Sequence, residues 1–404
     1  MTKDVVIVGG GAAGFFAAIQ LAKLKPQLSI AILEKSKEVL SKVKISGGGR
    51  CNVTHAEFIP NELTKYYPRG ERELKGPFHT FCSGDTMAFF EERGVALKIE
   101  EDGRIFPESD SSQSIIDCFL NETKKHGISI HTQCGVSEIL KEDKCWLIKT
   151  TKENFIAKQV LVATGSSPKV WTMLEQLQHT IIQPVPSLFT FNIKDNRIKD
   201  LAGLSTLSTI KVIGESLQAE GPTLITHWGL SGPGILRLSA WGARILNTLN
   251  YQFEIEVNWL YQKNPDEALA ILQEEKIKSS KKLIFNTKPF DLPKRLWHSL
   301  LVAAKVTSEL KWSDINKKQL QDLSFQLTKC VFNVNGKSTF KEEFVTAGGI
   351  DLKEINFKTY ESKLHHNLYF AGEVLNIDAI TGGFNFQNAW TSGYIAAQAM
   401  AASK

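Results

Sequence analysis

Hydrophobic and polar positions follow two different periods in the first part of the chain. Residues 4–8 are a short β-branched run, residues 15–24 are apolar over a longer stretch, and residues 28–33 are a second short apolar run. Apolar runs of roughly four to eight residues are typical of buried strands, whereas longer apolar stretches favour a helix. The pattern predicts a strand, a helix and a second, parallel strand, which together form a βαβ unit.

The middle of the chain reads as further α/β material. Asp110 and Gln113 have the spacing of a capping box, which predicts that a helix at 114–126 begins just after them. The other predicted elements are a helix at 85–93, two short strands around the turn at 102–104, and strands at 129–132, 136–141, 145–150 and 159–163.

The pattern changes at Pro184 and Pro186, which indicate the start of an inserted region that extends to about residue 340. Its first part, 188–262, is predicted to be β-rich, and its second part, 263–340, is lysine-rich and mainly helical. After the insert, a short strand at 368–373 precedes a last helix that reaches about residue 400.

Gly9, Gly11 and Gly14 lie between the first strand and the first helix. Their spacing, together with an acid at the end of the second strand, is that of a dinucleotide-binding βαβ unit. Glycine lets the backbone approach a pyrophosphate, the helix N-terminus attracts the phosphates, and Glu34 would bind the ribose hydroxyls. The alternative is a glycine-rich turn without a ligand, and the unit does not distinguish NAD from FAD. The candidate contacts are Gly9, Gly11, Ala12, Ala13, Gly14, Glu34 and Lys35.

A second glycine-rich segment follows at 42–54. Its three consecutive glycines can lie flat against a large ligand, which favours FAD, and Lys42 or Arg50 would offset phosphate charge. The alternative is a flexible surface loop. Cys51 has no cysteine nearby and is assigned to packing or a weak polar contact rather than redox chemistry. The candidate contacts are Lys42, Ser46, Gly47, Gly48, Gly49, Arg50, Cys51 and Asn52.

Two later segments end predicted strands in glycine. The first is Thr164-Gly165, and the second is Gly372-Glu373, which leads into the last helix. That helix would direct its positive N-terminal dipole at the flavin pyrimidine and stabilise negative charge there. The alternative is a glycine-rich turn before an ordinary helix. The candidate contacts are Thr164, Gly165, Gly372, Glu373, Asp378, Gly382, Gly383, Asn385, Phe386 and Gln387.

Composition narrows the classes of protein. The chain has 404 residues and a net charge of +5, which describes an ordinary globular protein of two or three domains. Glycines interrupt its apolar start, so no signal peptide and no membrane span are predicted, and we expect a cytoplasmic protein. The six cysteines are scattered, which favours reduced thiols and no metal site. Acids are interspersed among the basic residues at 276–295, which end with Arg295, and this favours a solvated face over a nucleic-acid partner.

The motifs together resemble a known family. GGGAAG at 9–14, SGGGRCN at 46–52, THWGLSGP at 226–233, VTAGG at 345–349 and GEVLNIDAITGGFNFQNA at 372–389 are similar to segments of bacterial NAD(P)/FAD-dependent oxidoreductases. That family includes aminoacetone-oxidase-like and dehydro bile acid reductase-like flavoproteins. The resemblance implies an α/β fold with a Rossmann-type FAD-binding domain in two segments, 1–187 and 341–404, interrupted by the insert at 188–340. It also implies a backbone contact from Val136 to the adenine.

Three functions remain open. The first is an FAD-dependent oxidoreductase in which flavin N5 exchanges a hydride with a small organic substrate, in an NAD(P)H-linked reduction. Because the chain has no second GxGxxG motif, NAD(P)H would be a transient electron donor. The second is an amine oxidase that uses oxygen and releases hydrogen peroxide, and the third is a non-catalytic flavin- or nucleic-acid-binding protein. His227 is the candidate proton donor or substrate contact, against a structural role in its turn, and we expect a monomer or a homodimer.

Overall fold

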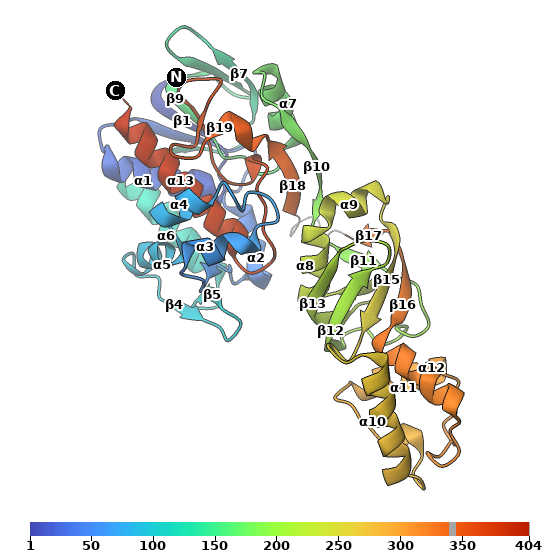
Figure 1. Cartoon of the computed structure of the whole chain (residues 1–404). Helices are drawn as coiled ribbons and strands as arrows, with labels where there is room; N and C mark the ends of the chain where they lie inside the picture. The colour runs from blue at the N-terminus through green and yellow to red at the C-terminus, as the bar shows by residue number, and fades with distance from the viewer. Residues whose placement is uncertain (339–344, 404) are drawn as a thin grey trace. The chain divides into compact units, whose positions relative to one another are not determined.

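The computed structural model describes residues 1–338 and 345–403 (Figure 1). Within these residues the chain divides into two compact units, Met1–Val185 with Lys341–Lys404, and Pro186–Phe340. They are called unit 1 and unit 2 below. The domain boundary predicted at 340/341 lies outside the described residues.

Unit 1 is built on a parallel sheet. Its strands lie in the order β6-β2-β1-β9-β21, with Val5 of β1 opposite Ile30 of β2 and Gln159 of β9. Strand β2 and the second half of β1 are buried, as expected for parallel strands that are covered on both faces. The predicted α/β class is confirmed. The strands are β1 (Thr2–Val8), β2 (Ile30–Leu33), β6 (Ser129–His131), β9 (Phe155–Val162) and β21 (Leu368–Phe370).

Two helices pack together against this sheet, as Figure 1 shows. Helix α1 (Ala12–Leu24) follows β1 and is buried from Ala13 to Ala22, and α13 (Phe384–Ala402) lies beside it. The two backbones come close at Gly393, where a Cβ would lie 2.9 Å from the Ala13 carbonyl oxygen. The last helix of the chain therefore shares a core with the first.

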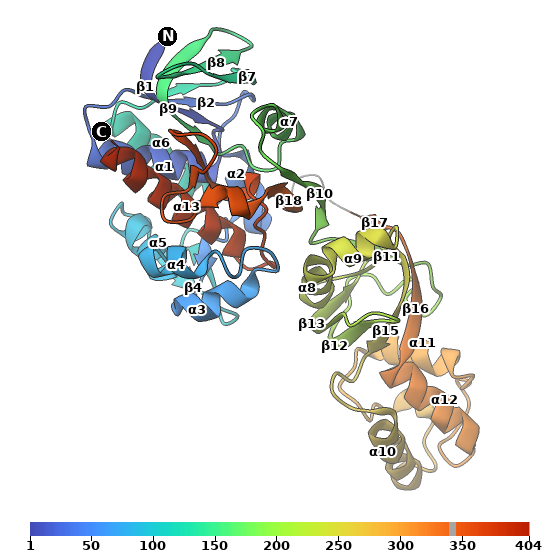
Figure 2. The same ribbon diagram turned by 45° about the horizontal axis from the view of Figure 1, so that its top comes forward.

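The other elements of unit 1 extend the sheet or surround it (Figure 2). Strands β7 (Val136–Lys141) and β8 (Trp146–Thr150) continue from β9, and β20 (Glu361–Ser362) and β19 (Ile355–Asn356) continue from β21. Smaller sheets are formed by β3 (Thr54–His55), β5 (Arg104–Pro107) and β4 (Leu97–Ile99), and by β10 (Ile181–Ser187) with β18 (Val345–Ile350). The remaining helices and 3-10 turns are α2 (Ser41–Gly49), α3 (Pro60–Leu63), η1 (Thr64–Tyr66), α4 (Lys75–Thr80), α5 (Ser83–Glu91), α6 (Ser112–Lys125), α7 (Pro168–Gln176), η3 (Leu352–Glu354) and η4 (Gly372–Val374).

The start of α6 differs from the prediction. The helix begins at Ser112, and its N-cap is Ser111, whose hydroxyl accepts a hydrogen bond from the Gln113 N–H at 3.3 Å. Asp110, the predicted cap, has a left-handed backbone with φ of 51°, and its carboxylate lies 2.5 Å from Lys98 Nζ. The predicted capping box is therefore wrong, because an ion pair with a neighbouring strand takes the carboxylate that would have capped the helix.

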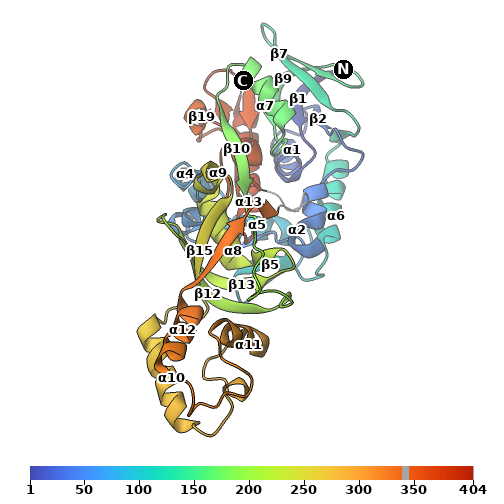
Figure 3. The same cartoon turned by 90° about the vertical axis from the view of Figure 1, so that its right-hand side faces the viewer.

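Unit 2 is an antiparallel sheet with helices packed on it (Figure 3). Its strands, in the order β16-β15-β12-β13-β14-β11-β17, are β11 (Thr190–Asn192), β12 (Ser205–Val212), β13 (Gln218–Ile225), β14 (Gly229–Ser231), β15 (Gln252–Asn258), β16 (Cys330–Asn335) and β17 (Lys337–Ser338). Helix α8 (Pro233–Trp241) packs on β12 and β13, and α9 (Ala243–Thr248) follows it. Between β15 and β16 lie α10 (Pro265–Lys278), η2 (Ile284–Asn286), α11 (Lys294–Ala303) and α12 (Lys317–Thr328), gathered at one end of the unit.

The sheet and the helical part of unit 2 share a hydrophobic core. Phe191 and Ile210 of the sheet and Trp297 and Leu323 of the helices belong to the same buried cluster. The β-rich and helical parts of the insert are therefore packed as one body rather than as separate domains. None of the described helices, here or in unit 1, has the length and apolar character needed to cross a membrane.

Candidate functional site

The carboxyl ends of four parallel strands meet at one edge of the sheet in unit 1. Gly9 directly follows β1, and Glu34 directly follows β2. One residue separates Thr164 from the end of β9, and one separates Gly372 from the end of β21. The pairs Val8–Leu33, Val8–Val162 and Phe370–Val162 bring these strand ends into register. Ligands of open α/β sheets bind at this edge. The sheet thus brings together residues from three separate motifs of the sequence.

Close backbone contacts explain the first and third glycines of the N-terminal motif. Gly9 has φ of +117°, and a Cβ there would lie 2.4 Å from the carbonyl oxygen of Ala163. A Cβ at Gly14 would lie 2.1 Å from the carbonyl oxygen of Gly9. Both glycines are therefore required by the packing of strand, turn and helix, as the spacing predicts.

Packing within the protein does not explain Gly11. A Cβ built there would have no atom within 4 Å, so the residue faces open space. Gly11 is also the N-cap of α1, which has no side-chain cap and no acidic residue in its first turn. The first N–H groups and the positive end of the helix dipole therefore remain available for an anion. These features fit a pyrophosphate group held against Gly11.

Glu34 is fixed beside this turn by two backbone donors. Its carboxylate accepts hydrogen bonds from the Gly10 N–H at 2.9 Å and from the Ser36 N–H at 2.8 Å. A carboxylate has about four lone-pair sites, so oxygen positions remain for ribose hydroxyls. Lys35 lies nearby, because a Cβ at Gly135 would be 3.5 Å from the Lys35 Cβ. The start of β7, where Val136 lies, is therefore close to the end of β2.

The second glycine-rich segment folds as a broken helix. Within α2, Ser46 has extended backbone angles, and Gly47 and Gly48 have left-handed φ values of 57° and 69°. The glycines of the segment therefore lie at the break in the helix. The amide of Asn52, oriented so that its nitrogen faces neighbouring carbonyls, accepts a hydrogen bond from the Gly383 N–H at 3.0 Å. This bond joins the segment to the start of α13.

Carboxylates hold the two cations that were predicted to offset phosphate charge. Lys42 Nζ lies 2.7 Å from an oxygen of Glu373, and the other oxygen of Glu373 accepts a hydrogen bond from the Thr346 N–H at 3.1 Å. Arg50 donates to Glu100 at 2.6 Å. Lys42 and Glu373, predicted from opposite ends of the chain, are thus in direct contact, whereas Arg50 is engaged by the small antiparallel sheet.

Two predicted contacts, Cys51 and Asp378, have no exposed surface. Burial raises the pKa of the Cys51 thiol to about 12, so the reactive thiolate is suppressed. The Asp378 carboxylate forms an ion pair with Arg69, whose Nε lies 2.5 Å from Oδ1. The ion pair with Arg69 holds Asp378 in the loop before α13, and the contact of Cys51 and Asp378 with a cofactor stays a prediction.

Gln387 is a third predicted contact with no exposed surface. Its carbonyl oxygen accepts hydrogen bonds from the hydroxyls of Thr54 at 2.6 Å and Thr86 at 2.9 Å, and its NH₂ group donates to Thr391 at 3.1 Å. The amide therefore ties α13 to β3 and α5. We assign it to holding the helix in place.

The N-terminus of α13, like that of α1, has no side-chain cap. Its N-cap is Gly383, with φ of +92° and no side-chain cap. Asn385 fixes the preceding loop by accepting a hydrogen bond from the Ala379 N–H at 3.0 Å and donating to the Ala379 carbonyl at 3.2 Å. The His55 ring stacks on Phe384 with 4.5 Å between centroids. Burial lowers the pKa of His55, which favours its neutral form.

Sequence reasoning missed several residues that shape this site. Arg69 lies outside every motif, and nothing in its local sequence indicates a partner 309 residues away. Thr346 lies in the VTAGG segment, which contributes to the family resemblance, so a signal was available for it. Among the described residues, no three His, Cys, Asp or Glu side chains are grouped so that they could hold a metal ion.

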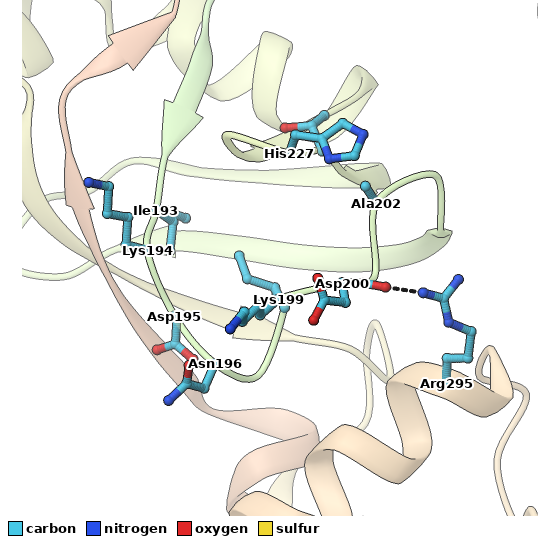
Figure 4. A pocket seen from close by; sticks show the side chains of 11 residues that line it. Ile193, Lys194, Asp195, Asn196, Lys199, Asp200, Ala202, His227 and Arg295 are labelled. Carbon is cyan, nitrogen blue, oxygen red and sulfur yellow. Dashed lines mark hydrogen bonds between the residues drawn. The ribbon is translucent and has the colours of Figure 1, made fainter.

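His227, the candidate catalytic residue, lies in unit 2 in the turn between β13 and β14. The Thr226 hydroxyl supports this turn by accepting hydrogen bonds from the N–H groups of Trp228 and Gly229, each at 3.2 Å. The exposed His227 ring forms no hydrogen bond with any described residue, so the turn does not depend on it. Instead, His227 lines a pocket of about 710 Å³ (Figure 4). Its catalytic role stays a prediction.

Comparisons with known proteins match nearly the whole chain. The family described as HI0933-like protein Rossmann domain matches residues 3–399. The chain is 30% identical over 410 residues to the ribosomal RNA dihydrouridine synthase of Haemophilus influenzae, and the match covers 98% of each protein. It is 26% identical over 406 residues to the 3-dehydro-bile acid delta(4,6)-reductase of Clostridium scindens, again with 98% of each covered.

A solved structure has a similar fold. The 3-ketosteroid-delta4-(5alpha)-dehydrogenase of Rhodococcus jostii RHA1 matches with a TM-score of 0.52 and 13% identity, covering 100% of this chain and 97% of that one. At this identity the likeness shows the fold alone.

Proposed function

The chain belongs to the HI0933-like protein Rossmann-domain family of FAD-dependent oxidoreductases, and from this we propose that it reduces a carbon–carbon double bond conjugated to a carbonyl group. The names of the two relatives support this chemistry. The uridine base has a ring double bond that is conjugated to a carbonyl group. Dihydrouridine is the product in which that double bond is saturated. A 3-dehydro bile acid with a double bond at position 4 is likewise a conjugated ketone. Both reductions add a hydride to the carbon β to the carbonyl and a proton to the α carbon.

The residues of unit 1 fit FAD, which supplies hydride-transfer chemistry when it is bound. Gly11 and the open N-terminus of α1 would hold the pyrophosphate, and Glu34 would bind the ribose hydroxyls. The open N-terminus of α13 at Gly383 offers a second positive dipole end. The single observation that carries the proposal is the space left beside Gly11, because a glycine that no internal contact requires lies where the fold binds a dinucleotide.

We further propose NAD(P)H as the reductant. Each turnover would consume one NAD(P)H and one proton and would yield NAD(P)⁺ and the saturated product. The chain carries no second dinucleotide motif, so the nicotinamide would bind transiently. His227 is the proposed donor of the proton to the α carbon, because its exposed ring is free of other hydrogen bonds among the described residues.

A uridine base of ribosomal RNA is the proposed substrate. The Haemophilus influenzae relative, which matches along its full length, is named for that reaction. The sequence by itself disfavours a nucleic-acid partner, because acids are interspersed among the basic residues at 276–295. Two cations of the unit 2 pocket, Lys194 and Lys199, lie outside that segment and supply a separate reason to consider RNA.

The test uses the full chain loaded with FAD in the absence of oxygen. NADH or NADPH is added while the flavin absorbance is followed, and then an unmodified ribosomal RNA transcript, free uridine or a 3-oxo-Δ4 steroid is added in separate samples. We expect NAD(P)H to bleach the flavin, the RNA to restore its absorbance, and mass spectrometry of the digested RNA to find a uridine that has gained two hydrogens. His227→Asn should slow the step with RNA but not the step with NAD(P)H, whereas His79→Asn, an exposed histidine of unit 1, should change neither.

Other outcomes would contradict the proposal. A purified chain that binds no FAD would remove it entirely. If the steroid but not the RNA reoxidised the flavin, a conjugated ketone would replace uridine as the proposed substrate. Bleaching by an amine such as aminoacetone, with release of hydrogen peroxide in air, would support the amine oxidase instead.

A further inference from the structure

Unit 2 contains a concave surface whose composition differs from that of an ordinary apolar pocket (Figure 4). The pocket of about 710 Å³ is formed by the loop after β11, the turn between β13 and β14, and the first turn of α11. Ile193 and Ile198, each 5% exposed, supply an apolar floor. Most of the other lining residues are charged or polar.

The charge of this pocket is positive. Lys194, Lys199 and Arg295 are exposed, and no ion pair among the described residues involves them. By contrast, Asp195 is neutralised by Arg197, whose Nε and Nη2 lie 2.9 and 2.8 Å from its two oxygens. The remaining acid of the lining is Asp200, whose backbone carbonyl accepts a hydrogen bond from Arg295, as Figure 4 shows. A concave surface with an excess of unpaired cations attracts anions.

An exposed aromatic residue is the chain neighbour of a residue that lines the pocket. Trp228 follows His227 and is 58% exposed, although tryptophan is usually well covered. Its carbonyl accepts a hydrogen bond from the N–H of Ile193, a residue that lines the pocket, at 2.9 Å. Cations that follow a phosphate backbone and an aromatic ring on which a base can stack are the two components of single-stranded nucleic-acid sites.

We propose that this pocket binds single-stranded RNA, with Lys194, Lys199 and Arg295 contacting phosphates and Trp228 stacking on a base. The inference rests on the proposed function, because a uridine inside a duplex is out of reach and the strand that carries it must be held unpaired. Phosphate contacts and stacking tolerate many sequences, so unit 2 holds the strand and does not itself select the target base.

The test measures binding without measuring reduction. The full-length, FAD-loaded protein is titrated with a fluorescein-labelled oligouridylate at several salt concentrations, and anisotropy gives the affinity. The pocket variants are Lys194→Glu with Lys199→Glu, and Trp228→Ala. The matched control is Lys281→Glu with Lys282→Glu, which makes the same charge change at exposed positions of the same unit.

The lysine pair in the pocket should weaken binding by about tenfold or more and reduce the slope of log affinity against log salt by roughly one for each phosphate that the variant no longer binds. Trp228→Ala should weaken binding about tenfold with an unchanged salt slope. The control should change affinity by about threefold or less, because its charges act only at a distance. The flavin absorbance and Tm of each variant should match those of the wild type. If charge reversal unfolds the protein, Lys194→Gln with Lys199→Gln provides a milder pair of substitutions.

Three results would overturn the inference. The first is that the pocket variants bind RNA as tightly as the wild type. The second is that the control weakens binding as much as the pocket variants do. The third is that inorganic phosphate displaces the oligonucleotide as readily as unlabelled RNA does. Failure of the proposed function looks different. If the wild-type protein binds RNA through this pocket but forms no dihydrouridine, the result supports the binding site and contradicts the proposed activity. If the wild-type protein reduces RNA and the pocket variants do so with the same KM, the result supports the activity and contradicts the binding site.

Discussion

At the scale of single residues, three histidines of unit 1 are shielded from water. Desolvation lowers the pKa of His55, His131 and His179 from the ordinary value of 6.5. His179 is the most enclosed, with Nδ1 2.8 Å from the carboxylate of Glu354 and Nε2 3.1 Å from the hydroxyl of Ser362. The carboxylate opposes the shift, but burial has the larger effect. The folded protein therefore favours the neutral form of each ring.

This preference predicts that stability decreases with acidification. Below pH 6.5 these histidines bind protons more readily in the unfolded chain than in the folded one. Their contribution to the free energy of unfolding is therefore at its maximum above that pH and declines as the pH falls below it. Urea unfolding between pH 8 and pH 5 would measure the decline. His179→Gln should make it shallower, while His79→Gln, at an exposed position of α4, should leave it unchanged. A stability curve that rises towards pH 5 would contradict the assignment.

At the scale of elements, the strand–turn–helix at the N-terminus separates two uses of glycine. Gly14 is needed because α1 crosses close to the turn, with only 2.1 Å between a Cβ at that position and the Gly9 carbonyl oxygen. A Cβ at Gly11, by contrast, would have no other atom of the protein within 4 Å. One glycine therefore maintains the fold, and the other leaves room for a ligand.

Two alanine substitutions should show this difference. Gly14→Ala forces the turn apart, so it should lower the free energy of unfolding of the FAD-free protein by about 1–3 kcal/mol. Gly11→Ala should lower that free energy by only about 0.5–1 kcal/mol, because alanine is a poorer N-cap than glycine, but it should weaken FAD binding about tenfold or more. Urea unfolding and a fluorescence titration with FAD measure the two effects. Normal FAD affinity in Gly11→Ala would show that the pyrophosphate lies elsewhere.

At the scale of the whole molecule, the predicted cofactor contacts and the proposed RNA pocket belong to different units. The cofactor candidates lie in unit 1, and His227 with the pocket cations lies in unit 2. The chain leaves unit 1 through β10 and returns to it through β18, and these strands pair with each other. Pro184 and Gly348 are in close contact there, since a Cβ at Gly348 would lie 2.6 Å from the Pro184 Cα. The two crossing points are therefore adjacent.

Removal of unit 2 should consequently leave FAD binding intact. A chain in which a short Gly/Ser linker replaces 188–344 should fold and bind FAD with an affinity within about tenfold of the full protein, because a short loop between adjacent strand ends costs little closure entropy. The same chain should not bind oligouridylate. Flavin absorbance after purification and anisotropy measure the two properties. A matched chain that contains only residues 186–338 should carry no flavin, and flavin in that chain would contradict the division of roles.

Local sequence was sufficient for features that depend on neighbours in the chain. The βαβ unit at residues 4–33 follows from apolar periodicity and from glycine spacing, since these determine what the backbone can do within a few residues. The capping box at Asp110 failed because Lys98 and Arg50, which are distant in sequence, take its carboxylate. The same limit applies to Arg69, because a partner 309 residues away leaves no local pattern.

The sequence by itself therefore determined the α/β class, the dinucleotide motif and the family resemblance, all of which rest on short-range periodicity and spacing. Only the tertiary structure decided which of the candidate residues are exposed and which are buried. Gly11 and Glu34 are accessible at the edge of the sheet, whereas Asp378 and Gln387 are buried and hold α13 in place. The pocket cations likewise come together only because the loop after β11 packs against the start of α11. Burial and long-range pairing are properties of the folded chain, and no local pattern encodes them.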